Sequence, residues 1–248
     1  MVYSVATDKG RSRSQNQDAA LAMDERIGCL PNLFMVADGM GGHQAGEYAS
    51  CQAIETARQV IGEGSIKEAV QAMNEAMTTA NRNVYQEAQN DPAKAGMGTT
   101  LVLASIDDDQ LSVANVGDSR LYVFHAGSLR QITRDHSVVE EMVRKGEVDR
   151  KHARNHPKRN QITRAVGAEP TVRVDLFDEV LAPGDLVLLC TDGLTTMVED
   201  EKIAEILSQQ NSVQEKVTQL VDKANANGGV DNITVIVIDP FSDEVRTC

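Results

Sequence analysis

Two stretches of the chain carry apolar side chains at the three- and four-residue spacing that places them on one face of a helix. They cover residues 45–61 and 66–88 and predict two consecutive long amphipathic helices. Shorter apolar runs at residues 2–8 and 33–38 come before them. These runs predict strands, and the second one ends at Asp38.

The pattern of apolar residues changes after the second predicted helix. Residues 98–133 hold three or four short apolar runs separated by DDDQ, GDS and HAGS, which is typical of strands joined by tight turns. Further along, the pattern predicts a short helix at 137–146, strands within 171–180 and 185–194, helices near 200–209 and 213–226, and a closing strand at 231–240. Because strands and helices do not alternate regularly, we expect an α+β fold, with antiparallel sheets and helices packed outside them in layers.

Length and composition set the broad class of the protein. The chain has 248 residues, of which 41% are hydrophobic, and it shows no repeat or linker, so a single domain is the simpler interpretation. No stretch approaches the roughly 20 apolar residues that span a membrane, and the N-terminus does not resemble a signal peptide. The four cysteines form no CxxC pair, which argues against a disulfide framework or a zinc site. We expect a cytoplasmic protein without a membrane partner.

The charge balance is strongly acidic. The net charge is −13, from 37 acidic and 24 basic residues, which argues against nucleic-acid binding because that needs a basic face. The excess of carboxylates is compatible with high solubility, and also with acidic residues gathered around cations. Composition does not choose between these two explanations.

Aspartates recur where a predicted strand meets a turn. The five positions are Asp18, Asp38, Asp118, Asp192 and Asp231. Any one of them has an ordinary explanation as turn chemistry. Several carboxylates at the ends of buried strands would be costly and would repel one another, unless a divalent cation compensated them. Mg²⁺ and Mn²⁺ prefer such oxygen ligands, so the set as a whole indicates a metal site.

The segment DGMGGH at residues 38–43 allows three interpretations: a phosphate-cradling loop, a metal loop or a tight turn. The chain lacks G-x-x-x-x-G-K-[ST], so this segment is not a Walker loop. It also lacks the G-x-G-x-x-G of a dinucleotide site, although a helix follows it.

The motifs, taken in order, resemble those of the metal-dependent Ser/Thr protein phosphatases of type 2C in their compact bacterial form. They are GRSRSQNQD, VADGMGGH, GTTLVLASI, ANVGDSRLYV, ITRDHS, ITRAVG, LLCTDGL and DNITVIVI. Each motif is weak by itself, but all of them in this order are specific, and the resemblance covers about residues 3–239. It implies a four-layer α-β-β-α sandwich of two antiparallel sheets flanked by helix pairs. It also implies one catalytic domain over 1–241, with a flap at about 140–164 and a short tail at 242–248.

The resemblance assigns roles to the aspartates. It implies that Asp38 bridges two Mn²⁺ or Mg²⁺ ions, that the Gly39 carbonyl binds one ion, and that Asp192 and Asp231 complete the shell of the other. Asp118 would share a third, weaker ion with Asp192. A water between two ions is acidified, so it would attack the phosphorus directly, without a phosphoenzyme. Glycine at position 39 also has a physical reason, because a carbonyl without a side chain beside it approaches an ion closely.

Two further candidates come from the loop before Asp18 and the segment after Asp38. The resemblance implies that Arg13 holds the phosphate, with Arg11 as the alternative in a different register. His43 is the candidate general acid, and the other interpretation is a surface histidine that caps the next helix. Some family members carry glutamate before the aspartate where this chain has Gln17 and Asp18. Asp18 is then the expected metal contributor, through a bound water.

The flap is basic although the protein is acidic. Eight of the 24 basic residues lie there: Arg144, Lys145, Arg150, Lys151, Arg154, Lys158, Arg159 and Arg164. Arg150, Lys151 and Arg154 are the candidate substrate-binding residues, which would attract phosphorylated acidic protein segments. The other interpretation is a solvated loop.

The predicted function is therefore a monomeric Ser/Thr phosphoprotein phosphatase that counteracts a bacterial Ser/Thr kinase. The alternatives are a phosphatase of small phosphoesters and a non-catalytic regulator that binds phosphoproteins.

Overall fold

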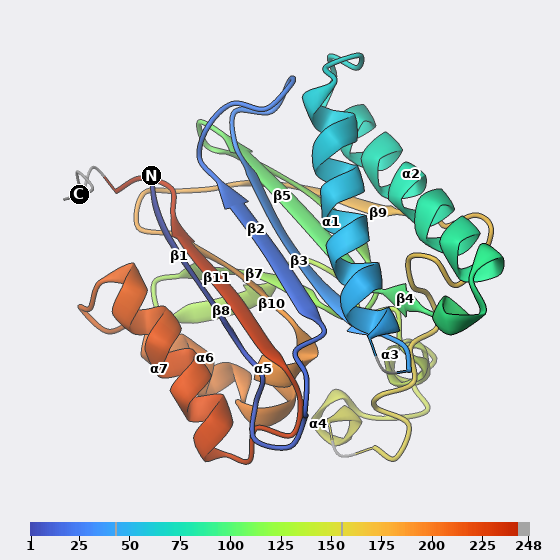
Figure 1. Ribbon diagram of the computed structural model, residues 1–248. Coiled ribbons are helices and arrows are strands. Elements are labelled where there is room, and N and C mark those ends of the chain that lie inside the picture. Colours follow the sequence, from blue (N-terminus) through green and yellow to red (C-terminus); the bar gives the residue numbers. More distant parts are fainter. Residues whose placement is uncertain (43, 155, 243–248) are drawn as a thin grey trace.

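Two antiparallel sheets lie face to face in the computed structural model, which describes residues 1–42, 44–154 and 156–242 (Figure 1). One sheet has the strand order β1-β11-β10-β7-β8. Its strands are β1 (Val2–Asp8), β11 (Ile233–Asp239), β10 (Leu186–Cys190), β7 (Arg120–His125) and β8 (Ser128–Gln131). The other sheet has the order β2-β3-β5-β6-β9, with β4 paired to β3. Its strands are β2 (Asp18–Met23), β3 (Leu33–Met40), β5 (Leu101–Asp107), β6 (Gln110–Val116), β9 (Asp175–Val180) and β4 (Gly98–Thr99).

Helix pairs cover the outer faces of both sheets (Figure 1). The helices α1 (Ala45–Gly62) and α2 (Ala69–Asn90) pack on the sheet that holds β3, and a short 3-10 turn at Pro92–Lys94 follows them. The helices α6 (Asp200–Leu207) and α7 (Val213–Ala226) pack on the sheet that holds β1 and β11. Separate apolar clusters fill the space under each helix pair and between the sheets. This confirms the predicted four-layer α-β-β-α sandwich.

The long helices follow from their sequence periodicity. Ala49, Ala53, Ala57 and Ile61 form one fully or almost fully buried stripe on α1. The helix α7 begins with a capping box, in which the Ser212 hydroxyl accepts from the Glu215 N–H and the Glu215 carboxylate accepts from the Ser212 N–H. Within the described part of the chain, no helix is both long and apolar enough to cross a membrane.

Some elements differ from the sequence prediction. The strand β2, with the sequence DAALAM, was not predicted, because alanine, leucine and methionine are poor strand indicators; its pairing with β3 decides its conformation. The predicted strand at 171–180 begins only at Asp175. Asp192 does not sit in a turn after β10, since it is the first residue of the short helix α5 (Asp192–Met197).

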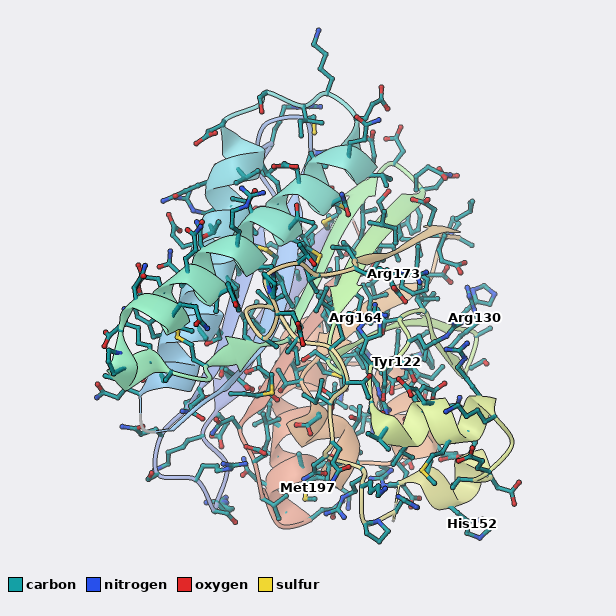
Figure 2. The ribbon with its side chains drawn as sticks, turned by 90° about the vertical axis from the view of Figure 1, so that its right-hand side faces the viewer. Tyr122, Arg130, His152, Arg164, Arg173 and Met197 are labelled. Carbon is teal, nitrogen blue, oxygen red and sulfur yellow. The ribbon has the colours of Figure 1, made fainter. Side chains whose placement is uncertain are left out.

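The flap contains two short helices, α3 (Val138–Arg144) and α4 (Arg150–Ala153). A bridge between Ser137 and Ile162 closes its base, and the Val138 N–H donates to the Gln161 carbonyl at 2.9 Å. Figure 2 shows the flap helices at the rim of the molecule, with His152 of α4 pointing outward. Most of the predicted tail at 242–248 lies outside the described residues.

Candidate metal centre

Carboxylates from both sheets meet at one end of the sandwich. Asp18 opens β2 and lies directly across from Asp38 of β3 in the strand register. Asp192 follows β10 and Asp231 precedes β11, both in the other sheet. Asp118 lies in the turn between β6 and β7. We call these five residues the carboxylate cluster.

The electrostatics show that the members of the carboxylate cluster act on one another. Burial raises the pKa of Asp18 to about 7, and the charges of Asp192 and Asp231 add to the rise. Burial also raises the pKa of Asp38 well above its usual value, followed by the charges of Asp18 and Asp192. The pKa of Asp192 rises to about 6, through burial first and the charge of Asp231 second. Burial and then the Asp192 charge raise the pKa of Asp118 as well. A bound cation would favour the ionised form of each of these carboxyl groups.

Two oxygens of the carboxylate cluster fit a metal or a metal-bound water. Asp18 Oδ1 and Asp192 Oδ1 are buried and accept no hydrogen bond. Buried carboxylate oxygens nearly always have a partner, so these two point to a ligand. Among the described residues, no three acidic, histidine or cysteine side chains lie close enough together to hold an ion by themselves.

The main chain around Asp38 is held by the residues just before β5. The Asp38 N–H donates to Thr100 Oγ1 at 2.8 Å. Its carbonyl accepts from the Thr100 N–H and from the Thr99 hydroxyl, both at 2.9 Å. The end of β3 is therefore fixed by hydrogen bonds that do not involve the Asp38 side chain.

Gly39 has a packing role that the sequence did not reveal. A Cβ at this position would lie 2.1 Å from the Gly46 carbonyl oxygen and 2.6 Å from that of Gln17. A Cβ on Gly46 would in turn lie 2.8 Å from the Gly39 oxygen. Backbone therefore packs directly on backbone where β3, α1 and the loop before β2 meet.

The N-terminal loop reaches the carboxylate cluster through Arg13. Its Nη2 donates to Asp231 Oδ2 at 2.7 Å, and its side chain remains 53% exposed. Of the two candidate arginines, Arg13 is the one whose guanidinium bonds a cluster carboxylate. Arg11 attaches the loop through its main chain, which donates to the Gly229 carbonyl at 2.7 Å.

Asn232 anchors this loop and was not singled out from the sequence. Its Nδ2 donates to the carbonyls of Lys9 and Gln15, both at 2.9 Å, and its Oδ1 accepts from the Gln17 N–H at 2.8 Å. The side chain is almost fully buried. Its place in the motif DNITVIVI, between Asp231 and an apolar strand, is the sequence signal that could have drawn attention to it.

An ion pair lies close to Asp118 in the chain. The next strand begins with Arg120, whose Nε and Nη2 bind both oxygens of Asp135 at 3.0 and 2.7 Å. Its Nη1 donates to the Tyr122 hydroxyl at 2.8 Å. The GDSR and RDHS motifs are therefore joined by a bidentate ion pair, which the sequence analysis did not anticipate.

A cavity of about 810 Å³ extends from the carboxylate cluster toward the flap. Its lining includes Asp118 and Asp192 on one side and Arg150 and Arg154 of the flap on the other. Arg150 donates to Glu140 Oε1 at 2.8 Å. Arg154 donates to the Thr196 carbonyl of α5 at 3.0 Å. Figure 2 labels Met197, the residue that follows Thr196 in the chain.

Two of the predicted site positions cannot be placed. His43, the candidate general acid, lies outside the described residues. So does the side chain of Lys151. The structure therefore brings together the carboxylates, Gly39, Arg13 and two of the three flap positions.

The fold and the site define the class of metal-dependent protein phosphatases. The serine/threonine phosphatase PstP/Ppp of Mycobacterium tuberculosis superposes with a TM-score of 0.87 at 34% identity, over 96% of this chain and 97% of that one. A structure of the PstP catalytic domain in complex with two manganese ions gives a TM-score of 0.84 at 32% identity, over 96% and 97% of the two chains.

The sequence comparisons agree. The family profile of protein phosphatase 2C matches residues 7–231, and the chain belongs to this metal-dependent family. The serine/threonine phosphatase stp of Listeria monocytogenes is 38% identical over 237 residues, which cover 94% of this chain and 93% of the relative. Protein phosphatase PhpP of Streptococcus pneumoniae is 35% identical over 253 residues, which cover 99% and 100%. The protein is a Ser/Thr protein phosphatase, whose substrates are phosphoproteins.

Proposed function

We propose that this phosphatase hydrolyses phosphoserine and phosphothreonine directly, without a phosphoenzyme, at two Mn²⁺ or Mg²⁺ ions held by the carboxylate cluster. The observation that carries the proposal is the convergence of carboxylates from both sheets, with the buried oxygens Asp18 Oδ1 and Asp192 Oδ1 lacking any hydrogen-bond donor. Two bound ions would supply an activated water and neutralise the charge of the phosphoryl group.

Each residue of the site would have its own place in the shells of the ions. Asp38, from its fixed strand end, would bridge both ions, and the Gly39 carbonyl would complete one shell. Asp192 and Asp231 would complete the other shell, and Asp18 would act through a water. Asp118 would hold a third ion more weakly, because it would share that ion with Asp192 and mostly with water.

Arg13 would orient the substrate. Its guanidinium pairs two phosphoryl oxygens in a fork that lysine cannot form. The exposed ion pair with Asp231 already places this guanidinium beside the carboxylate cluster. His43 would donate the proton to the leaving alkoxide.

Cysteine chemistry has poor support near this site. Cys190 lies two residues before Asp192 in the chain, but it is fully buried, and burial raises the pKa of its thiol far above the usual value. A thiol that does not ionise is a weak nucleophile. This favours direct hydrolysis.

The cellular setting belongs to the same proposal. The enzyme would act in the cytoplasm as a monomer and would reverse the action of a Ser/Thr kinase. The basic flap would recruit acidic phosphorylated segments, since Arg150 and Arg154 face the cavity beside Asp118.

Hydrolysis of a phosphothreonine peptide with added Mn²⁺, with Mg²⁺ and with EDTA tests the proposal. We expect turnover with either ion, none in EDTA, and no phosphorylated enzyme in acid-quenched samples. Turnover of small aryl phosphates alone would favour the small-phosphoester alternative. Peptide binding without hydrolysis would favour the non-catalytic regulator.

A further inference from the structure

A chain of hydrogen-bonded side chains ends on Asp18. The hydroxyls of Thr191 and Thr234 donate to Asp18 Oδ2 at 2.8 and 2.7 Å. Thr7 Oγ1 lies 2.8 Å from Thr234 Oγ1. Asn16 Nδ2 donates to Thr7 Oγ1 at 2.8 Å. We call these five residues the hydroxyl chain.

The direction of each hydrogen bond follows from counting protons. A threonine hydroxyl has a single proton to donate. Thr234 donates its proton to Asp18, so its contact with Thr7 must be an accepted bond, and Thr7 in turn accepts from Asn16. Thr191 also donates to Asp18, and its oxygen accepts from the Thr234 N–H at 3.0 Å. The Thr7 hydroxyl therefore donates to Thr234, and the Thr191 and Thr234 hydroxyls both donate to Asp18 Oδ2.

The two oxygens of Asp18 are thus unlike. Oδ2 accepts from two hydroxyls and is saturated, whereas Oδ1 is buried and accepts from no group. The residue is only 8% exposed, and both threonines that donate to it are fully buried. A buried carboxylate oxygen in this state is costly unless it faces a ligand.

The hydroxyl chain also connects the two sheets. Asp18 belongs to β2 of one sheet, whereas Thr7 and Thr234 belong to β1 and β11 of the other. Asp18 pairs with Asp38 in the strand register, and Thr191 directly precedes Asp192. The bonds to Asp18 Oδ2 therefore join the two halves of the carboxylate cluster.

We propose that Thr191 and Thr234 are positioning residues for the metal centre: their hydroxyls hold Asp18 so that Oδ1 faces the ions, and they hold the carboxylates of the two sheets at a fixed separation. The inference rests on the proposed function, because it assumes that the ions bind at the carboxylate cluster. Residues that orient metal ligands in this way typically change metal affinity by about 10- to 100-fold when they are altered.

Paired substitutions separate the hydroxyl from its methyl group. Thr234→Val keeps the shape and removes the donor, whereas Thr234→Ser keeps the donor and removes the methyl group. The same pair is made at Thr191. Thr56→Val on α1 is the control, because Thr56 is also a buried threonine, at 4% exposure, but lies outside the hydroxyl chain. Thr7→Val, at an exposed position of β1, tests the hydroxyl chain one bond further out with little risk to folding.

The readout is Mn²⁺ affinity by titration calorimetry on the full chain, beside the Mn²⁺ concentration for half-maximal peptide turnover. We expect Thr191→Val and Thr234→Val to bind Mn²⁺ about 10- to 100-fold more weakly. The Mn²⁺ concentration for half-maximal turnover should rise in the same ratio. The serine variants and Thr56→Val should stay near wild type. Thr7→Val should weaken binding by a smaller factor in the same direction.

Unchanged Mn²⁺ affinity in Thr234→Val and Thr7→Val overturns the inference. Equal losses in the valine and serine variants overturn it as well, because they would show that packing and not the hydroxyl matters. The wild-type protein separates this failure from that of the proposed function. If it bound no Mn²⁺ and hydrolysed no phosphopeptide, the metal centre itself would be wrong.

Discussion

The carboxylate cluster and the flap border the same cavity but are held in different ways. The Asp38 N–H donates to the Thr100 hydroxyl, and the Asp38 carbonyl accepts from Thr99 and Thr100. The flap is closed at its base by the bridge between Ser137 and Ile162, and its helices are held by side-chain donors, from Arg150 to Glu140 and from Arg154 to the Thr196 carbonyl. Ion-binding chemistry needs ligands fixed within a fraction of an ångström, which strands provide. Recognition of varied protein segments suits a loop.

The charged groups of the two regions also differ in their exposure to solvent. Burial raises the pKa of several carboxyl groups in the carboxylate cluster, whereas Arg150 of the flap is 66% exposed. The carboxylate cluster should therefore respond to pH and to metal, and the flap should respond to salt. The predictions below test this contrast, beginning with the largest expected effect.

Replacing Asp38 should have the largest effect. Asp38→Ala removes a proposed ligand of both ions, and Asp38→Asn removes the charge while it keeps the shape. We expect phosphopeptide turnover to fall by about 10³-fold or more in both, which corresponds to about 4 kcal/mol of lost transition-state stabilisation. Steady-state kinetics with Mn²⁺ measures it. Near wild-type turnover in either purified variant would refute the two-metal assignment.

Gly39 and Gly42 form a matched pair in the same segment. Gly39→Ala places a Cβ 2.1 Å from the Gly46 oxygen, whereas a Cβ at Gly42 meets nothing within 4 Å. We expect Gly39→Ala to lower the free energy of unfolding by about 1–3 kcal/mol and to weaken Mn²⁺ binding, because the strand end must shift. Urea unfolding and calorimetry should find Gly42→Ala close to wild type. Equal behaviour of the two variants would contradict the packing argument.

Asp118→Ala should separate the third ion from the central pair. The protein should stay folded and bind two Mn²⁺ ions at low concentration, because Asp118 does not contribute to their proposed shells. Phosphoprotein turnover should still fall, by about 10-fold, if the third ion assists the reaction. Calorimetry decides the assignment. Loss of all tight binding would make Asp118 a ligand of the central pair, and no change in binding or turnover would leave it as a turn residue.

Reversing the charge of the flap should act on substrate capture. The triple variant Arg150→Glu, Lys151→Glu and Arg154→Glu should lower kcat/KM for an acidic phosphopeptide by about tenfold at low salt, and less at high salt. A small aryl phosphate should be hydrolysed almost as before. An equal loss on both substrates would indicate a folding or metal defect instead of weaker recruitment.

The smallest effect should be the pH dependence of stability without metal. Burial raises the pKa of Asp18 to about 7 and that of Asp192 to about 6, against about 3.9 for an unfolded aspartate. The folded state thus binds the carboxyl protons of Asp18 and Asp192 more tightly than the unfolded state does. Protonation of these two groups therefore contributes fully to the free energy of unfolding below about pH 4, and this contribution is lost as pH rises through 6 and 7.

In EDTA the midpoint of thermal unfolding should therefore fall by a few degrees between about pH 5.5 and about pH 8. Saturating Mn²⁺ should remove this trend, because the ion binds the ionised carboxylates. Asp18→Asn should flatten the EDTA profile in part. A midpoint in EDTA that rises over this interval would contradict the assignment of the two carboxyl groups.

The sequence alone was sufficient for the elements with strong periodicity. The helices α1 and α7 begin and end within a residue or two of their predicted bounds, because an amphipathic stripe is a local property of the chain. The aspartates at strand ends could also be picked out locally, since a charge beside a buried strand is unusual wherever it occurs. The resemblance to type 2C phosphatases then named the fold and the reaction class.

Only the tertiary structure decided how the site is supported. The strand β2 has no local strand signal and exists because β3 lies beside it. Thr191 and Thr234 stand 173 and 216 residues from Asp18 along the chain, so nothing in their sequence surroundings connects them to it. Hydrogen bonds between distant residues depend on the packing of two sheets, and periodicity describes only one element at a time. The sequence thus supplied the candidate ion-binding residues, and the fold determined which groups hold those residues in place.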